Sequence, residues 1–202
     1  MSYSEYPHRG NLADSEILRG EFYNDAIMTA YENEVNRFGM KLSKLASAAM
    51  GEYTQHNSNG PGTQNDAPFV HIKQYIEDRI LGTPASEITD VSKEHQKYAH
   101  SLCKSISAYT QLIHLSPLYR GMKVIPDTLK SKSVGDSVVI DTIISASSYV
   151  KSSINFCDSD GLLMIIKDAY GIPIDNNVNE FEFMLAPGSQ LVVDVIYRID
   201  YY

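Results

Sequence analysis

Apolar side chains in the first half of the chain recur at the spacing of an α-helix. After Asp14, a residue type that favours helix starts, Phe22, Ala26 and Ala30 follow at intervals of four residues, which places them on one helical face. The polar stretch Gln55–Pro68 has almost no apolar residue and is expected to be a loop. The same helical period returns in three further segments, which we expect to be helices: one ending near Met50, one over Phe69–Leu81 and one over Asp90–Leu112.

After Pro117 the pattern changes to short runs rich in β-branched and aromatic residues, separated by turn-forming residues. A helical segment followed by a sheet-rich one predicts an α+β fold. We expect a loose arm over residues 1–13 and a single domain over 14–202, with a helical lobe at 14–115 and a sheet-rich half at 116–202. The expected strands are Leu118–Met122, Ser137–Ser145, Leu162–Lys167, Glu180–Leu185 and Leu191–Ile199.

The chain has 202 residues and a net charge of −8 at pH 7, so one domain with a sizeable core is expected. An acidic chain is poorly suited to phosphate backbones, which disfavours nucleic acid as a main partner. The two cysteines are too few for a disulfide framework and favour a reduced, cytoplasmic protein. The polar first residues lack the apolar segment of a signal peptide. The sequence has no run of about 18 apolar residues, so no membrane span is expected.

A pair of carboxylates on the fourth expected strand is the first candidate for chemistry. Residues two apart on a strand point to the same face, so Glu180 and Glu182 should project side by side, about 6.5–7 Å apart. Phe181 and Phe183 would then point to the opposite face, into a core. Two carboxylates on one face and two aromatic rings on the other indicate a site rather than a solvated edge.

Two further motifs accompany this pair on strands of their own, Leu118-Tyr119-Arg120-Gly121 and Ile144-Ser145-Ala146-Ser147. Arginine, then serine, then Glu-x-Glu, in this order, resembles the Arg-Ser-Glu class of mono-ADP-ribosyltransferases. That class includes the actin-modifying binary toxins of clostridia, the vegetative insecticidal proteins and small transferases carried by tailed phages. The resemblance covers about residues 45–202. It implies the ADP-ribosyltransferase fold, in which a helical N-terminal lobe packs on a split mixed β-sheet core.

The resemblance implies a catalytic role for three residues. Glu182 would accept a hydrogen bond from the ribose 2′-hydroxyl of NAD and stabilise the electron-poor ribosyl carbon, as carboxylates do in glycoside hydrolysis. Glu180 would orient an acceptor guanidinium and help remove its proton. Ser145 would hydrogen-bond Glu182 and fix its rotamer.

The resemblance also implies residues that bind NAD. Arg120 would hold the phosphates, because a planar guanidinium matches a pair of phosphate oxygens. Gly121 would leave room for the ligand, since it has no side chain. Ser147 is a further candidate. The middle motif departs from the usual Ser-Thr-Ser at Ala146, whose side chain should point away from both serines.

Three more NAD contacts are expected on the same ground. Phe156 would stack near the nicotinamide, Lys151 would contact a phosphate, and Tyr53, placed after the second helix, would contact NAD from the helical side. Relatives often carry an arginine near Lys151, which this chain lacks, and it has Ile72-Lys73 where relatives usually have Ile-Asn.

Taken together, the motifs predict an NAD-dependent transferase that modifies arginine on a target protein in the cytoplasm, with NAD as substrate, no metal and no membrane partner. The six histidines do not cluster, and no Walker or Gly-x-Gly-x-x-Gly motif is present. The alternatives are an NAD glycohydrolase, an inactive binding or inhibitory module on the same fold, and a transferase that modifies a nucleic acid base or uses NAD-capped RNA.

Overall fold

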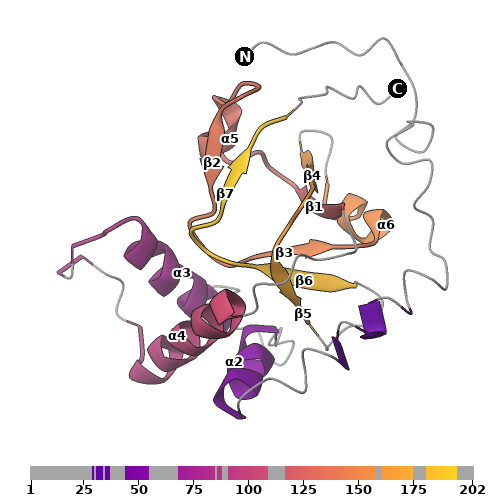
Figure 1. Cartoon of the computed structure of the whole chain (residues 1–202). Helices are drawn as coiled ribbons and strands as arrows, with labels where there is room; N and C mark the ends of the chain where they lie inside the picture. Colours follow the sequence, from indigo (N-terminus) through magenta and orange to yellow (C-terminus); the bar gives the residue numbers. More distant parts are fainter. Residues whose placement is uncertain are drawn as a thin grey trace, which may run out of the picture.

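The computed structural model describes residues 29, 31–33, 35–36, 44–54, 68–84, 86–87, 91–108, 117–157, 161–174 and 181–194. The three longest helices gather on one side of a central sheet, and a two-stranded ribbon extends at the other end (Figure 1). The expected arm at 1–13, the expected helix from Asp14 up to residue 28, the loop 55–67 and Glu180 lie outside the described residues, and the described residues from 29 to 36 are helical.

The helical layer consists of α2 (Lys44–Thr54), α3 (Pro68–Ile80) and α4 (Lys93–Ala108), which pack against one another. The helix expected over 69–81 is confirmed, with Ile72, Tyr75 and Ile76 buried on one side. Ile80, one turn further along the same side of the helix, is 43% exposed. The next helix begins three residues later than expected, because the Ser92 hydroxyl caps it by accepting a hydrogen bond from the His95 N–H at 3.2 Å.

A five-stranded sheet has the order β4-β1-β3-β6-β5. Every pairing between described strands is antiparallel, so this part of the chain does not show the mixed sheet that the resemblance implied. The connection from β5 to β6 is short, and a short connection favours antiparallel neighbours because a parallel pair needs a long crossover. The strands are β1 (Leu118–Met122), β3 (Ile144–Ser147), β4 (Leu162–Ile166), β5 (Gly171–Pro173) and β6 (Glu182–Leu185).

The single strand expected over 137–145 is in fact two strands in two sheets. β2 (Ser137–Val139) pairs with β7 (Gln190–Val192) in the separate ribbon, whereas β3 joins the large sheet. Gly171, a residue type that favours turns, lies between two of the expected strands but begins β5. That strand ends at Pro173 and lies at an edge of the sheet, where a missing backbone N–H is tolerated. Two short helices, α5 (Asp127–Lys130) and α6 (Val150–Ile154), were not predicted.

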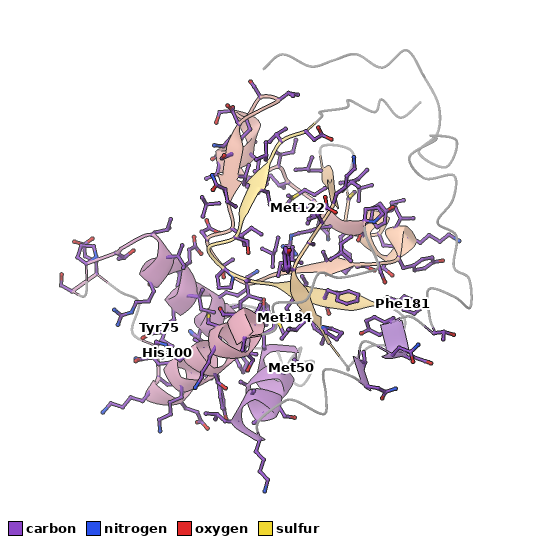
Figure 2. All side chains as sticks on the ribbon, in the orientation of Figure 1. Met50, Tyr75, His100, Met122, Phe181 and Met184 are labelled. Atoms are coloured by element: carbon purple, nitrogen blue, oxygen red, sulfur yellow. The ribbon has the colours of Figure 1, made fainter. Side chains whose placement is uncertain are left out.

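Two apolar clusters cover the two faces of β3 and β6. Met184 packs with Met50, Ile72 and Leu102 in the cluster beneath α2, α3 and α4. Figure 2 places Met184 toward these helices and Phe181 at the far end of β6. Because side chains alternate along a strand, the helix-covered face also carries Ser145, Ser147 and Glu182.

The opposite face of β6 is held by aromatic packing. Phe181 and Phe183 are both buried, and the Tyr31 ring meets each of them edge-on with centroids 5.5 Å apart. The expectation that both phenylalanines enter a core is confirmed. Ala146 lies opposite Phe183 in the register and is 3% exposed in the same cluster. The alanine that replaces the usual threonine is therefore a core residue, pointing away from the two serines.

Candidate active site

Glu182 is the first residue of β6 and lies opposite Ser147 of β3. The residue before it, Phe181, has φ of 48°, in the left-handed region that non-glycine residues rarely adopt. The backbone is therefore not extended at Phe181. The period-two argument that placed Glu180 beside Glu182 requires an extended residue between them and does not hold here. Glu180 itself lies outside the described residues.

The Phe181 backbone is fixed by the end of β3. Its carbonyl accepts hydrogen bonds from the Ser148 N–H at 3.0 Å and the Ser148 hydroxyl at 3.4 Å. The Tyr149 ring packs edge-on against the Phe181 ring, with centroids 5.7 Å apart. On the other side of β6, the Ile174 N–H donates to the Glu182 carbonyl at 2.9 Å. The backbone at the start of β6 is thus held by hydrogen bonds from residues that follow β3 and β5.

Ser145 lies on the same face of the sheet as Glu182, and the register places it opposite Met184, the next residue of β6 on that face. No hydrogen bond joins its hydroxyl to the described Glu182. Its expected role in fixing the Glu182 rotamer stays a prediction. Ser145 contributes its backbone instead: its carbonyl accepts a 2.6 Å hydrogen bond from Nη1 of Arg120.

Arg120, on β1, is half-buried beside Glu182 and Tyr53. Burial lowers the pKa of its guanidinium, whereas Tyr53 and Glu182 raise that pKa. Arginine keeps its charge under such shifts. Within the described part of the chain, its guanidinium forms no ion pair with a carboxylate. Its other donors therefore remain available to an anionic ligand.

Tyr53 lies in the last turn of α2 rather than after the helix, and its side chain is 8% exposed. Its hydroxyl donates to the Ile143 carbonyl at 3.2 Å, just before β3. Burial raises the pKa of the phenol far above its ordinary value; Glu182 raises that pKa as well, and Arg120 lowers it. The expected NAD contact is thus a buried, neutral phenol near both charged groups, and its contact with NAD stays a prediction.

Ser147 and Gly121 both serve the packing of α6. The Ser147 hydroxyl accepts from the Tyr149 N–H at 2.9 Å and donates to the Tyr149 carbonyl at 3.1 Å, which fixes the turn into the helix. A Cβ added at Gly121 would fall 1.8 Å from the Ser153 carbonyl oxygen. The space expected for a ligand beside Gly121 is therefore filled by α6 backbone. Roles of these two residues in NAD binding stay predictions.

Phe156 and Lys151 lie after and on α6, respectively. Phe156 is 52% exposed, so it is not a core residue, and Lys151 is also exposed. In Figure 1, α6 lies beside β1, on the other side of the sheet region from α2, α3 and α4. Both side chains are open to solvent, as a residue that contacts a ligand must be, and their roles stay predictions.

Lys73 was not a candidate and belongs beside this site. It is half-buried on α3, and its carbonyl accepts a 3.3 Å hydrogen bond from the Thr142 hydroxyl. Burial lowers the pKa of its ammonium, and so does the charge of Arg120; Glu77 and Asp141 raise that pKa. The available signal was a lysine directly after Ile72, in place of the asparagine of the Ile-Asn pattern that the resemblance implies.

The arrangement brings a guanidinium from β1, a carboxylate from β6 and a phenol from α2 into mutual electrostatic range. A fixed cation beside a fixed carboxylate can bind an anionic group and stabilise positive charge developing next to it. Among the described residues, no group of histidine, cysteine, aspartate or glutamate could hold a metal ion. No helix in those residues is long and apolar enough to cross a membrane.

Solved ADP-ribosyltransferase structures share this architecture. Vis of Vibrio splendidus, in complex with agmatine, matches with a TM-score of 0.55 at 16% identity, over 88% of this chain and 81% of that chain. Plx2a, a toxin from Paenibacillus larvae, matches with a TM-score of 0.55 at 13% identity, over 82% and 84%. A mutant of the eukaryotic mono-ADP-ribosyltransferase ART2.2, in complex with NAD, matches with 0.54 at 15%, over 88% and 78%.

Comparison of the sequence with models of known protein families found no match. A search of curated proteins found none either. The structural likeness instead extends over most of this chain and most of each of these three structures. The chain therefore has the ADP-ribosyltransferase fold, of the α+β class predicted from its sequence.

Proposed function

We propose that the protein transfers ADP-ribose from NAD to an arginine side chain of a target protein. The observation that carries this proposal is the position of Arg120: it donates to the Ser145 carbonyl and lies within electrostatic range of Glu182. These are the three residues of the Arg-Ser-Glu motif, gathered from β1, β3 and β6 on the ADP-ribosyltransferase fold.

In the proposed reaction, the bond between the nicotinamide nitrogen and the ribose C1′ breaks, and nicotinamide leaves as a neutral molecule with the bonding electrons. Arg120 holds the phosphates by charge-assisted hydrogen bonds. Glu182 accepts a hydrogen bond from the ribose 2′-hydroxyl and places negative charge near the electron-poor C1′. A guanidine nitrogen of the acceptor then bonds to C1′ and loses its proton, which Glu180 takes up.

Two observations support this function against an inactive module and favour arginine as the acceptor. Ala146, the departure from Ser-Thr-Ser, packs opposite Phe183 in the core and does not replace a side chain on the face that carries Glu182. Agmatine, present in the Vis complex, carries the same guanidinium group as arginine. Because the motifs also resemble those of phage transferases, a protein of an infected host cell is the first acceptor to test.

The test is to incubate the purified protein with NAD and agmatine and to measure both nicotinamide and ADP-ribosylated agmatine. We expect the two products to appear in comparable amounts. Free nicotinamide with unmodified agmatine would instead establish a glycohydrolase, and the absence of both would contradict the proposal. Mass spectrometry of peptides from a lysate incubated with NAD then identifies the modified residue and protein.

A further inference from the structure

The segment from Thr142 to Ser145, which leads into β3, forms three hydrogen bonds with other elements. The Thr142 hydroxyl donates to the Lys73 carbonyl of α3 at 3.3 Å. The Ser145 carbonyl accepts from Arg120 of β1 at 2.6 Å, and the intervening Ile143 carbonyl accepts from Tyr53 of α2. The same short segment therefore contacts both the backbone of Lys73 and the guanidinium of Arg120.

The two side chains are close enough that the charge of Arg120 lowers the pKa of Lys73. Both are half-buried, and within the described residues neither forms an ion pair with a carboxylate. Glu77 and Asp141 also act on Lys73, and their charges favour its protonated form. Two like charges held together in a partly buried place repel each other, and an anion bound between them relieves that repulsion.

The buried neighbours of Lys73 keep it at this position. Ile72 is fully buried in the cluster between the helices and the sheet, together with Ile143 and Met184. Residue 73 thus follows directly after a core residue, at the point where α3 approaches the segment leading into β3. The backbone of Lys73 is therefore held close to the segment that Arg120 also contacts.

We propose that Lys73 binds the diphosphate of NAD together with Arg120, with one cation for each phosphate group. The proposal rests on the function proposed above and extends it to a residue that the three motifs do not contain. A dinucleotide diphosphate carries two adjacent negative charges, and a lysine ammonium is a compact point charge suited to the one that the arginine fork does not hold.

The test uses ADP-ribose, which has the diphosphate but no nicotinamide, and measures its dissociation constant by calorimetry. Lys73→Gln removes the charge at similar length, and Lys73→Arg keeps the charge. Lys97→Gln, at an exposed position of α4, is the matched control. We expect Lys73→Gln to weaken binding about tenfold or more, as for the loss of a charged hydrogen bond. Lys73→Arg and Lys97→Gln should stay within about twofold of wild type.

The results separate this proposal from the one on which it rests. If wild type binds ADP-ribose and consumes NAD but Lys73→Gln binds ADP-ribose equally well, the role of Lys73 is wrong and the proposed function stands. A lower melting temperature in Lys73→Gln with unchanged affinity would likewise show that Lys73 only balances Glu77 and Asp141. If wild type neither binds ADP-ribose nor consumes NAD, both proposals fall.

Discussion

Ser147, and not Ser145, lies directly opposite Glu182 in the ladder between β3 and β6. Directly opposed side chains on antiparallel strands are the closest cross-strand neighbours. The Ser147 hydroxyl also exchanges hydrogen bonds with both backbone groups of Tyr149, whose ring packs against Phe181 next to Glu182. The serine two residues after the one that the motif indicates thus links the strand pair that carries Glu182 to the turn into α6.

Ser147→Ala should therefore damage the protein more than Ser145→Ala. Loss of the Tyr149 hydrogen bonds should lower the free energy of unfolding by about 1 kcal/mol, and a looser turn should reduce the rate of nicotinamide release. The Ser145 hydroxyl makes no hydrogen bond to a described residue, so Ser145→Ala should leave stability nearly unchanged. Urea unfolding and NAD consumption of both variants check this. A larger loss of activity in Ser145→Ala would instead support the role that the motif implies for Ser145, which is to fix the rotamer of Glu182.

The two glutamates should separate the two halves of the reaction. Glu182→Gln removes the charge that stabilises the ribosyl carbon, so nicotinamide release and agmatine labelling should both fall by roughly 100-fold or more. Glu180→Gln should abolish labelling but retain nicotinamide release, because only the acceptor loses its base. Product analysis by chromatography measures both. Normal labelling by Glu180→Gln would show that another group activates the acceptor.

Local sequence patterns predicted the three long helices α2, α3 and α4 and the order of the arginine, serine and glutamate motifs along the chain, because these depend on neighbours in the chain. The period of Ile72, Tyr75 and Ile76 located α3. The strand run at 137–145 did not reveal its division, because the bend between β2 and β3, at Asp141 and Thr142, contains no glycine or proline. β5 begins at Gly171 and ends at Pro173, and both residue types favour turns. They are tolerated in this strand because it lies at an edge of the sheet.

The missed features of the site are all non-local. The Ser147 pairing with Glu182 is a matter of register between strands far apart in sequence. The left-handed backbone at Phe181 depends on Ser148, which holds its carbonyl, and phenylalanine itself gives no sign of it. Lys73 became a candidate only because the folded chain brings it within electrostatic range of Arg120, on another element. Motifs can name the residues of a site, but the contacts among them require the folded chain.

Cys103 should make stability fall with pH above the ordinary range of a thiol. Burial raises the pKa of Cys103 to about 11. At high pH the unfolded chain loses this proton before the folded chain does, so the free energy of unfolding decreases from the unfolded-state pKa up to about 11. Urea unfolding between pH 8 and 10 measures the slope. Cys103→Ala should flatten it, and an unchanged slope would assign the dependence to other groups.

Two glycines provide a matched test of how tightly α6 packs on β1. A Cβ at Gly121 would lie 1.8 Å from the Ser153 carbonyl oxygen, which is backbone and cannot move aside cheaply, whereas nothing lies within 4 Å of a Cβ at Gly51 in α2. Gly121→Ala should therefore lower the free energy of unfolding by several kcal/mol. Gly51→Ala should raise it by about 0.5–1 kcal/mol, because alanine favours the helix. Denaturant unfolding of both variants decides the matter. Equal, small effects would mean that the helix carrying Ser153 can move away from β1, and the close approach would then have no part in placing Arg120.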